Sequence, residues 1–251
     1  MIGALLALAL AAAPPGCGLP AVGPGARPWK PGESLTYDLD LLGMVQAGTM
    51  QLGVERPLSA GKVLPLRARA KSTKSVASLQ PFAGVALSWV DAAALRPERY
   101  REDVEEGGVH KSSDFRLLPA GPQIVVEHAE GKETKRTTYA RERDVVDPIS
   151  VLFQLRAARL SPGDRFCMDL VGLGRAWRVE GTVAARPERV ETPAGRFDTV
   201  RVDLEARRAD RPDSKPRAIH LWIGTDARRL PVAMLGEAEI GPVSATLSSL
   251  R

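Results

Sequence analysis

The chain has 251 residues, of which 44% are hydrophobic, and this is enough apolar material to form a sizeable core. Wholesale disorder is therefore excluded. Its 35 basic residues are nearly matched by 30 acidic ones, and the two kinds are scattered along the chain. A nucleic-acid-binding protein needs a clustered basic surface, so we expect a mixed, solvated surface and no nucleic-acid partner.

A short apolar run, Leu5 to Ala13, opens the chain. It is much shorter than the ~20 apolar residues of a membrane-spanning helix and fits the central region of a secretory signal peptide. No Lys or Arg precedes it, and the first charged side chain is Arg27. We predict a signal peptide with a Pro/Gly-rich leader over residues 1–26, one domain over residues 27–251, and export to the periplasm.

Cys17 directly follows this run and admits two interpretations. In bacterial lipoproteins a lipid is attached to such a Cys, and Gly16 is the small residue expected before it, so Cys17 would anchor the protein to the outer membrane. Pro14 and Pro15 do not fit that pattern, and the alternative is that Cys17 is removed with the signal peptide. In both cases Cys167 has no partner in the mature chain, so the sequence predicts no structural disulfide.

The first strong strand pattern lies between residues 34 and 41. Leu35, Tyr37 and Leu39 share one face while Ser, Thr and Asp occupy the other, which is typical of a half-buried strand. Residues 49–54 continue the same alternation and predict a second strand.

The next segments mix strand and helix signals. A third strand is predicted over residues 63–70, at a sheet edge or a bulge because Pro65 interrupts it. Val76, Leu79 and Phe82 recur every three residues and predict a short helix that begins after Ser72 or Thr73 and ends near Pro81. Residues 87–90 then return to a strand.

Four short strands are predicted between Arg99 and Tyr139. They are separated by turn signals at Gly107-Gly108, at residues 119–122 and at Gly131-Lys132. A spacing of about ten residues from turn to turn is typical of an antiparallel meander. The segments between these strands are too short for the crossover helices of parallel units.

The clearest helix signal begins at Asp147. Its carboxylate can accept hydrogen bonds from the first free N–H groups, and Pro148 lies where a missing donor costs nothing. Residues 149, 152, 153 and 156 mark one face of about three turns. Four or five further strands are predicted around residues 166–171, 177–183, 190–191, 199–206 and 219–223, and a last pair near residues 232–237 and 243–247. The predicted fold is all-β, a single antiparallel meander sheet curved into an open or closed barrel, with one or two short helices.

Several short motifs occur in an order that resembles a known bacterial family. They are Pro31-Gly32-Glu33 with Tyr37, Asp147 to Ser150 with Leu155-Arg156, Pro162-Gly163-Asp164, Glu191 to Phe197, and Trp222-Ile223 with Asp226 and Arg229 to Val232. Together they resemble the family known as domain of unknown function 3108, over most of the chain after Arg27. The resemblance implies an exported envelope protein with a curved, barrel-like antiparallel sheet, and it supplies no catalytic residue.

The chain contains no recognisable catalytic or metal-binding motif. The three histidines lie far apart in the sequence and none pairs with a Cys at ligand spacing, so we predict no metal and no cofactor (His110, His128 and His220). The segment Gly172 to Gly174 lacks the third glycine of a dinucleotide-binding loop and is interpreted as a strand turn. Asp226 with the two arginines that follow it is interpreted as an ion-pair turn. We expect a protein that is not an enzyme.

Two functions remain. The first is a binding module for a lipid or another hydrophobic envelope molecule. Alternating aliphatic strands, in a chain with only 5% aromatic residues, can leave the lumen partly empty. Its predicted cavity face consists of Leu35, Tyr37, Leu39, Leu221 and Ile223. The alternative is a structural or assembly factor that contacts another envelope protein through a surface or a sheet edge. A hydrolase would require His or carboxylate pairs that the fold brings together.

Overall fold

The computed structural model describes residues 17–41, 43, 45–78, 81–117, 121–238 and 241–251. Sixteen strands in this part of the chain form a single sheet, accompanied by two α-helices and a short 3-10 turn. The strands are β1 (Ser34–Leu41), β2 (Val45–Val54), β3 (Val63–Ser72), β4 (Phe82–Asp91), β5 (Pro97–Glu106), β6 (Val109–Arg116), β7 (Gln123–Glu130), β8 (Glu133–Ala140), β9 (Val145–Val146), β10 (Arg165–Gly172), β11 (Arg175–Val183), β12 (Glu188–Thr192), β13 (Gly195–Arg208), β14 (Arg217–Gly224), β15 (Pro231–Ala238) and β16 (Gly241–Leu250). The helical elements are α1 (Lys74–Ala77), α2 (Pro148–Ala157) and the 3-10 turn Ser59–Gly61.

Nearly all neighbours in the sheet are antiparallel and consecutive in the chain. The order runs from β8 back to β1, then to β16, and back again to β13, β11, β10 and β9, with β12 paired only to β13. The pairing of β1 with β16 joins the two halves of the chain, while β8 and β9 end the path without pairing to each other. The predicted all-β meander is therefore confirmed, and its barrel is open.

One pairing departs from the predicted pattern. The two-residue strand β9 runs parallel to β10, with Val145 opposite Asp169, and α2 forms the crossover between them. Two residues are too few for an alternation to be read from sequence, so no strand was predicted there.

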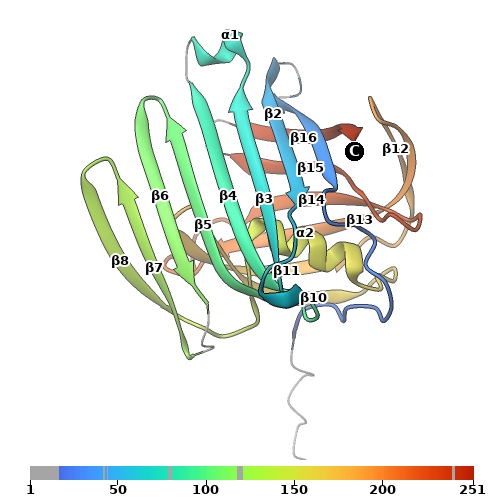
Figure 1. Cartoon of the computed structure of the whole chain (residues 1–251), viewed down its shortest axis with the longest axis horizontal. Coiled ribbons are helices and arrows are strands. Elements are labelled where there is room, and N and C mark those ends of the chain that lie inside the picture. The colour runs from blue at the N-terminus through green and yellow to red at the C-terminus, as the bar shows by residue number, and fades with distance from the viewer. Residues whose placement is uncertain (1–16, 42, 44, 79–80, 118–120, 239–240) are drawn as a thin grey trace, which may run out of the picture.

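The sheet folds over α2 (Figure 1). Strands β2–β8 run along the front of the view, β10–β16 cross behind them at a steep angle, and α2 lies between the two layers. The helix contacts β3 and β4 on one side and β10 on the other. The core is therefore built from the inner faces of both layers and from α2.

The predicted alternation of β1 is present in the structure. Leu35 and Tyr37 are fully buried and lie opposite Leu52 and Met50 of β2. The Tyr37 hydroxyl donates a hydrogen bond to the carbonyl oxygen of Pro231 at 2.8 Å, so its polar end is satisfied inside the core. Burial raises the pKa of this phenol well above its usual range.

The prediction that β3 lies at an edge or a bulge is wrong. The strand pairs with β2 on one side and β4 on the other without a register shift. Pro65 is tolerated because β2 ends at Val54, which pairs with Leu66, so the ladder does not require an N–H from the proline.

The first predicted helix is present but shorter than expected. Thr73 caps α1 and its hydroxyl accepts a hydrogen bond from the Val76 amide, as predicted for this position. Phe82, the last residue of the periodic pattern that predicted the helix, begins β4. Leu79 lies outside the described residues.

The second predicted helix has the expected start. Asp147 accepts hydrogen bonds from the Ile149 and Ser150 amides, both at 2.9 Å, and the Ser150 hydroxyl accepts one from the Asp147 amide. The expectation of a single buried face is wrong, because every residue from Ile149 to Arg156 is buried. A helix enclosed by sheet on both sides has no wet face.

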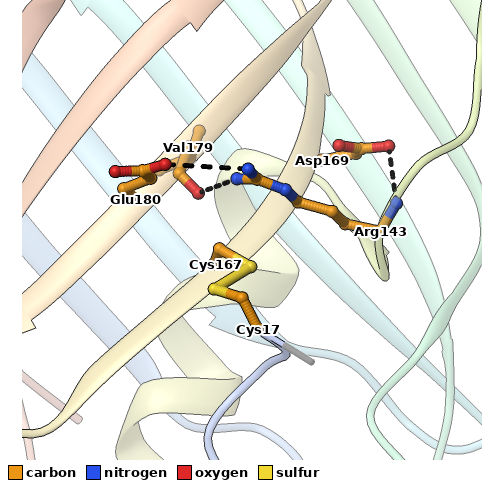
Figure 2. Close-up of a disulfide and its surroundings, with 6 residues drawn as sticks. All are labelled: Cys17, Arg143, Cys167, Asp169, Val179 and Glu180. Atoms are coloured by element: carbon orange, nitrogen blue, oxygen red, sulfur yellow. Dashed lines mark hydrogen bonds and ion pairs between the residues drawn. A yellow bond between two sulfur atoms is a disulfide. The ribbon is translucent and has the colours of Figure 1, made fainter. Parts of the chain in front are cut away.

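A disulfide fastens the N-terminal segment to the sheet, contrary to the prediction of none (Figure 2). Cys17 and Cys167 are bonded, with their Cα atoms 5.5 Å apart, and the Cys167 amide donates to the Gly18 carbonyl. The prediction of no disulfide depended on lipidation or removal of Cys17, and two cysteines 150 residues apart in the sequence carry no local signal that they lie side by side.

Residues after Cys17 continue along α2. The Gly23 amide donates to the carbonyl of Ala157 at 2.8 Å, and the Gln154 side chain donates to the carbonyl of Pro20 at 3.3 Å. Trp29 packs edge-on against Phe153 with ring centroids 5.0 Å apart. The described part of the predicted leader, residues 17–26, therefore contacts the folded domain.

Candidate functional site

An apolar pocket of about 400 Å³ lies between α2 and the inner face of strands β10, β11 and β13–β16. Its lining residues are Pro148, Val151, Leu152, Leu170, Gly172, Leu173, Trp177, Val179, Leu204, Ala206, Arg217, Ile219, Leu221, Met234, Leu235, Gly236, Glu237, Val243, Ser244 and Ala245. A volume of this size lies within the usual range for small-molecule sites, and most of the lining is aliphatic.

Small residues on neighbouring strands leave this space open. Ala245 of β16 lies opposite Met234 of β15, and Gly236 of β15 lies opposite Ile219 of β14. A Cβ atom added at Gly236 would meet its nearest neighbour, a side-chain carbon of Ile219, only at 4.0 Å. Larger side chains at these positions would fill the space beneath α2.

The polar groups of the pocket lie towards its rim. Glu237 is exposed, and the Arg217 guanidinium lies over the Trp177 ring, 5.2 Å from its centroid. Leu173, in the turn between β10 and β11, is 61% exposed, so the pocket reaches the surface beside this turn. Such an arrangement suits an amphiphile whose apolar part enters the pocket and whose polar end stays at the rim.

Only Leu221 of the five predicted cavity residues lines this pocket. Leu35, Tyr37 and Ile223 are buried in the core, and Leu39 is half-buried and pairs with the lining residue Ala245. The residues that sequence reasoning missed are the small ones. Ala and Gly at inward positions of β13, β15 and β16 could have indicated the pocket. That indication becomes readable only when the pairing register of these strands is known.

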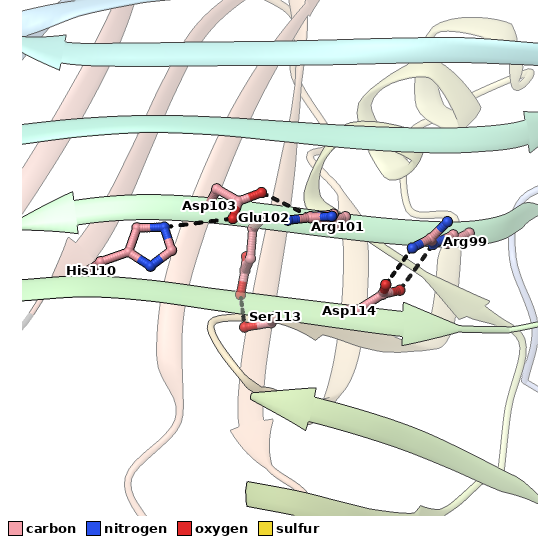
Figure 3. A network of polar contacts seen from close by, with 7 residues as sticks. All are labelled: Arg99, Arg101, Glu102, Asp103, His110, Ser113 and Asp114. Atoms are coloured by element: carbon pink, nitrogen blue, oxygen red, sulfur yellow. Dashed lines mark hydrogen bonds and ion pairs between the residues drawn. The ribbon is translucent and has the colours of Figure 1, made fainter. Parts of the chain in front are cut away.

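The fold does bring a histidine, a serine and a carboxylate together on the inner faces of β5, β6 and β7. The Ser113 hydroxyl donates to Glu102 at 2.8 Å and lies 3.0 Å from Nδ1 of His128. Figure 3 shows the Glu102–Ser113 contact, with the ion pairs of Arg99 and Arg101 on the neighbouring positions. In a hydrolytic triad the imidazole lies between serine and carboxylate, whereas here the serine lies between them, so its proton is directed at Glu102.

This polar cluster holds the turn between β10 and β11. The Gly174 amide donates to Glu102 at 3.0 Å, and the Tyr100 hydroxyl donates to the same carboxylate at 3.1 Å. Leu173 and Gly174 both have positive φ, as a two-residue hairpin turn of type I′ requires. The interpretation of Gly172 to Gly174 as a strand turn is therefore confirmed.

Other polar groups have local roles. Asp226 accepts hydrogen bonds from the amides of Arg228 and Arg229 and pairs with the Arg228 side chain, which confirms the ion-pair turn. His220 is half-buried and contacts Asp203 at 2.5 Å. Among the described residues, no group of three or more His, Cys, Asp or Glu side chains is placed to hold a metal ion. No helix in that part of the chain is both long enough and apolar enough to cross a membrane.

The amino-acid sequence matches the model of a known protein family over most of its length. Residues 36–248 match the family described as protein of unknown function DUF3108. The chain belongs to the DUF3108 family. This DUF3108 protein has no match among curated proteins.

Solved structures with a similar fold include a β-barrel-like protein of domain of unknown function DUF1849 from Brucella abortus. That protein is 12% identical, with a TM-score of 0.58, over 94% of this chain and 99% of its own. A candidate lipoprotein from Parabacteroides distasonis gives a TM-score of 0.34 at 10% identity, over 90% of this chain and 97% of its own. The first of these likenesses supports the barrel-like fold of this DUF3108 protein.

Proposed function

We propose that this DUF3108 protein is an exported, non-catalytic binding protein for a lipid or another hydrophobic molecule of the cell envelope. The pocket beneath α2 is the single observation that carries this proposal. Its volume of about 400 Å³ accommodates on the order of a dozen methylene-sized groups, at roughly 30 Å³ each. The ligand would therefore be an acyl chain or a molecule of similar bulk.

The burial of the lining side chains supports a preformed site. Trp177 and Leu204 are almost fully buried and belong to the continuous core, and Val151 and Leu152 project from the enclosed helix. A site built on such elements needs little reorganisation to receive a ligand, which favours affinity.

The disulfide supports the proposed compartment. Disulfides persist in oxidising compartments such as the periplasm and are rare in the cytosol. A Cys17 sulfur bonded to Cys167 cannot also carry a lipid, so the proposed mature form retains Cys17 as a structural residue and lies in the periplasm without an anchor there.

The assembly-factor alternative draws less support from the sheet edge. Strand β8 pairs only with β7 and so forms an edge of the sheet. Its exposed side chains include Glu133, Lys135 and Arg136, and charged side chains discourage strand addition at an edge. The arrangement around Ser113 likewise gives a hydrolase no activated nucleophile.

The test measures probe uptake and stability on matched variants. Wild-type protein is titrated with the apolar fluorescent probe N-phenyl-1-naphthylamine, and a solvent extract is analysed for co-purifying acyl lipid by mass spectrometry. Ala245→Phe places a ring in the pocket and should abolish uptake with little change in the unfolding midpoint, because it fills empty space.

Two controls complete the test. Val109→Phe, at a position at the start of β6 that is 41% exposed and does not line the pocket, should leave uptake unchanged. Ala176→Phe, at a fully buried position that does not line the pocket, should instead destabilise by ~1–3 kcal/mol. Absence of both probe uptake and co-purifying lipid in the wild-type protein would refute the binding function.

A further inference from the structure

An exposed leucine marks the place where the pocket reaches the surface. Leu173 is 61% exposed, more than any other large hydrophobic side chain in the described part of the chain. It lies at the tip of the β10–β11 turn with a φ of 55°, and the amide of the next residue, Gly174, donates a hydrogen bond to Glu102. A rigidly held turn therefore presents an apolar side chain to the solvent beside an apolar pocket.

A second hairpin lies against this turn. The Ala209 amide donates to the Ala176 carbonyl at 3.0 Å, and Trp177 pairs with Arg208. The connection from β13 to β14 follows, and its far end returns to Arg217, whose guanidinium covers the Trp177 ring. The two hairpins thus lie side by side and form one rim of the pocket opening, to which Leu173 and Arg217 contribute lining side chains.

This rim is predominantly basic. We define it as residues 173–175 and 207–217, which carry six Lys or Arg side chains and two Asp side chains (Arg175, Arg207, Arg208, Arg211, Lys215 and Arg217, with Asp210 and Asp213). Glu237, the exposed acidic residue of the pocket lining, belongs to β15 and lies outside this segment. Asp210 is paired with Arg208. Arg207, Arg211 and Lys215 are exposed. The chain as a whole is nearly balanced in charge, so the excess on this rim is a local feature.

We propose that the rim around the β10–β11 turn docks onto a bilayer that contains anionic phospholipid, so that the ligand passes between membrane and pocket. Exposed basic side chains are attracted to an anionic bilayer, and a protruding leucine can insert among its headgroups. An anionic bilayer complements the positive charge of the rim, and its lipids match the apolar pocket behind the rim. The inference rests on the proposed lipid-binding function and adds the surface from which the ligand is taken or to which it is delivered.

The outer face of β3 offers a matched control surface. Arg69 and Lys71 project from it and are both exposed, but the pocket beneath α2 does not open there. The variant R69Q/K71Q removes one Arg and one Lys from this face. The variant R211Q/K215Q removes the same two residue types from the rim, so the two variants have the same net charge.

The experiment is co-flotation with vesicles of phosphatidylglycerol and phosphatidylcholine, compared with vesicles of phosphatidylcholine alone. We expect wild-type protein to float with the anionic vesicles only. R211Q/K215Q should lower the partition on the order of twentyfold, because each exposed basic side chain contributes a several-fold gain near an anionic surface. Leu173→Asn, which suits a positive φ, should also weaken flotation, and R69Q/K71Q should not.

Probe uptake from solution is measured on the same proteins and separates the two proposals. R211Q/K215Q should retain uptake, because neither residue lines the pocket. Equal flotation with both vesicle types, no flotation at all, or loss of flotation in R69Q/K71Q rather than R211Q/K215Q would overturn the docking surface while uptake still reports on the pocket. Flotation without any uptake would instead refute ligand binding and leave the membrane contact standing.

Discussion

Arg156 of α2 and Glu33, 123 residues apart in the sequence, form a buried ion pair with Nη1 and Oε1 2.6 Å apart. The guanidinium is inaccessible to solvent and also donates to the carbonyl oxygens of Pro28, Arg228 and Arg229. It therefore ties the segment before β1, the end of α2 and the turn between β14 and β15 to one point.

Removing one partner of this pair should be costly. Glu33→Ala leaves the Arg156 charge buried and without its counter-ion, and we expect a loss of ~3–5 kcal/mol in the free energy of unfolding. Urea denaturation followed by tryptophan fluorescence measures it. The control is Asp198→Ala, which removes an exposed pair with Arg189 and should cost less than about 1 kcal/mol. Similar losses in the two variants would mean that the buried pair contributes no more than a surface one.

The ion pair also shows what the sequence could predict. The motifs containing Glu33, Arg156 and Arg229 were recognised separately, and strand alternation correctly predicted most of the sheet. The sequence could not predict that Glu33, Arg156 and Arg229 meet at one point, because alternation shows which face of a strand a residue occupies but not the order of the strands in the sheet. Register decides which inward positions face one another, and that is why the pocket was predicted at Leu35 and Tyr37 rather than near Ala245.

Asp147 provides a pH-dependent test of the α2 cap. It is fully buried and also accepts a hydrogen bond from Ser88 at 2.6 Å, and burial raises the pKa of its carboxyl group. Asp147→Ala removes all these acceptors and should cost ~1–2 kcal/mol or more. Asp147→Asn keeps an acceptor for the helix amides and can donate to Ser88, so it should cost much less.

The two states of Asp147 set the direction of the pH effect. Because its pKa is raised on folding, the native protein binds the proton more tightly than the unfolded chain. Wild-type stability should therefore fall relative to Asp147→Asn as pH rises from about 3.9, and the difference should stop growing above the native pKa. Urea midpoints of both proteins across this range measure it, and a difference that shrinks with rising pH would contradict the assignment.

The disulfide should contribute measurably to stability. Closing a loop of 150 residues restricts the unfolded chain, and we expect Cys17→Ser with Cys167→Ser to lose ~2–4 kcal/mol. Reductant should lower the melting temperature of the wild-type protein towards that of the double variant and leave the double variant unchanged. A wild-type protein that is insensitive to reductant and shows two free thiols would contradict the observed pairing.

Gly174 tests the contact between the β10–β11 turn and the polar cluster. A Cβ atom there would lie 2.6 Å from Nδ1 of His128, and the residue has a φ of +70°. Gly174→Ala therefore combines a steric clash with the conformational cost of positive φ, which is about 1 kcal/mol. Gly108→Ala, at φ +80° with no atom within 4 Å of the added Cβ, has the conformational cost alone.

The comparison isolates the clash. In urea denaturation Gly174→Ala should lose clearly more stability than Gly108→Ala, and adding His128→Ala should recover the excess, because the ring that the methyl group meets is then gone. Since Gly174 directly follows Leu173 at the pocket opening, the same variant should also change the affinity for an apolar probe. Equal losses for the two glycine variants would show that the turn does not pack on His128 in solution.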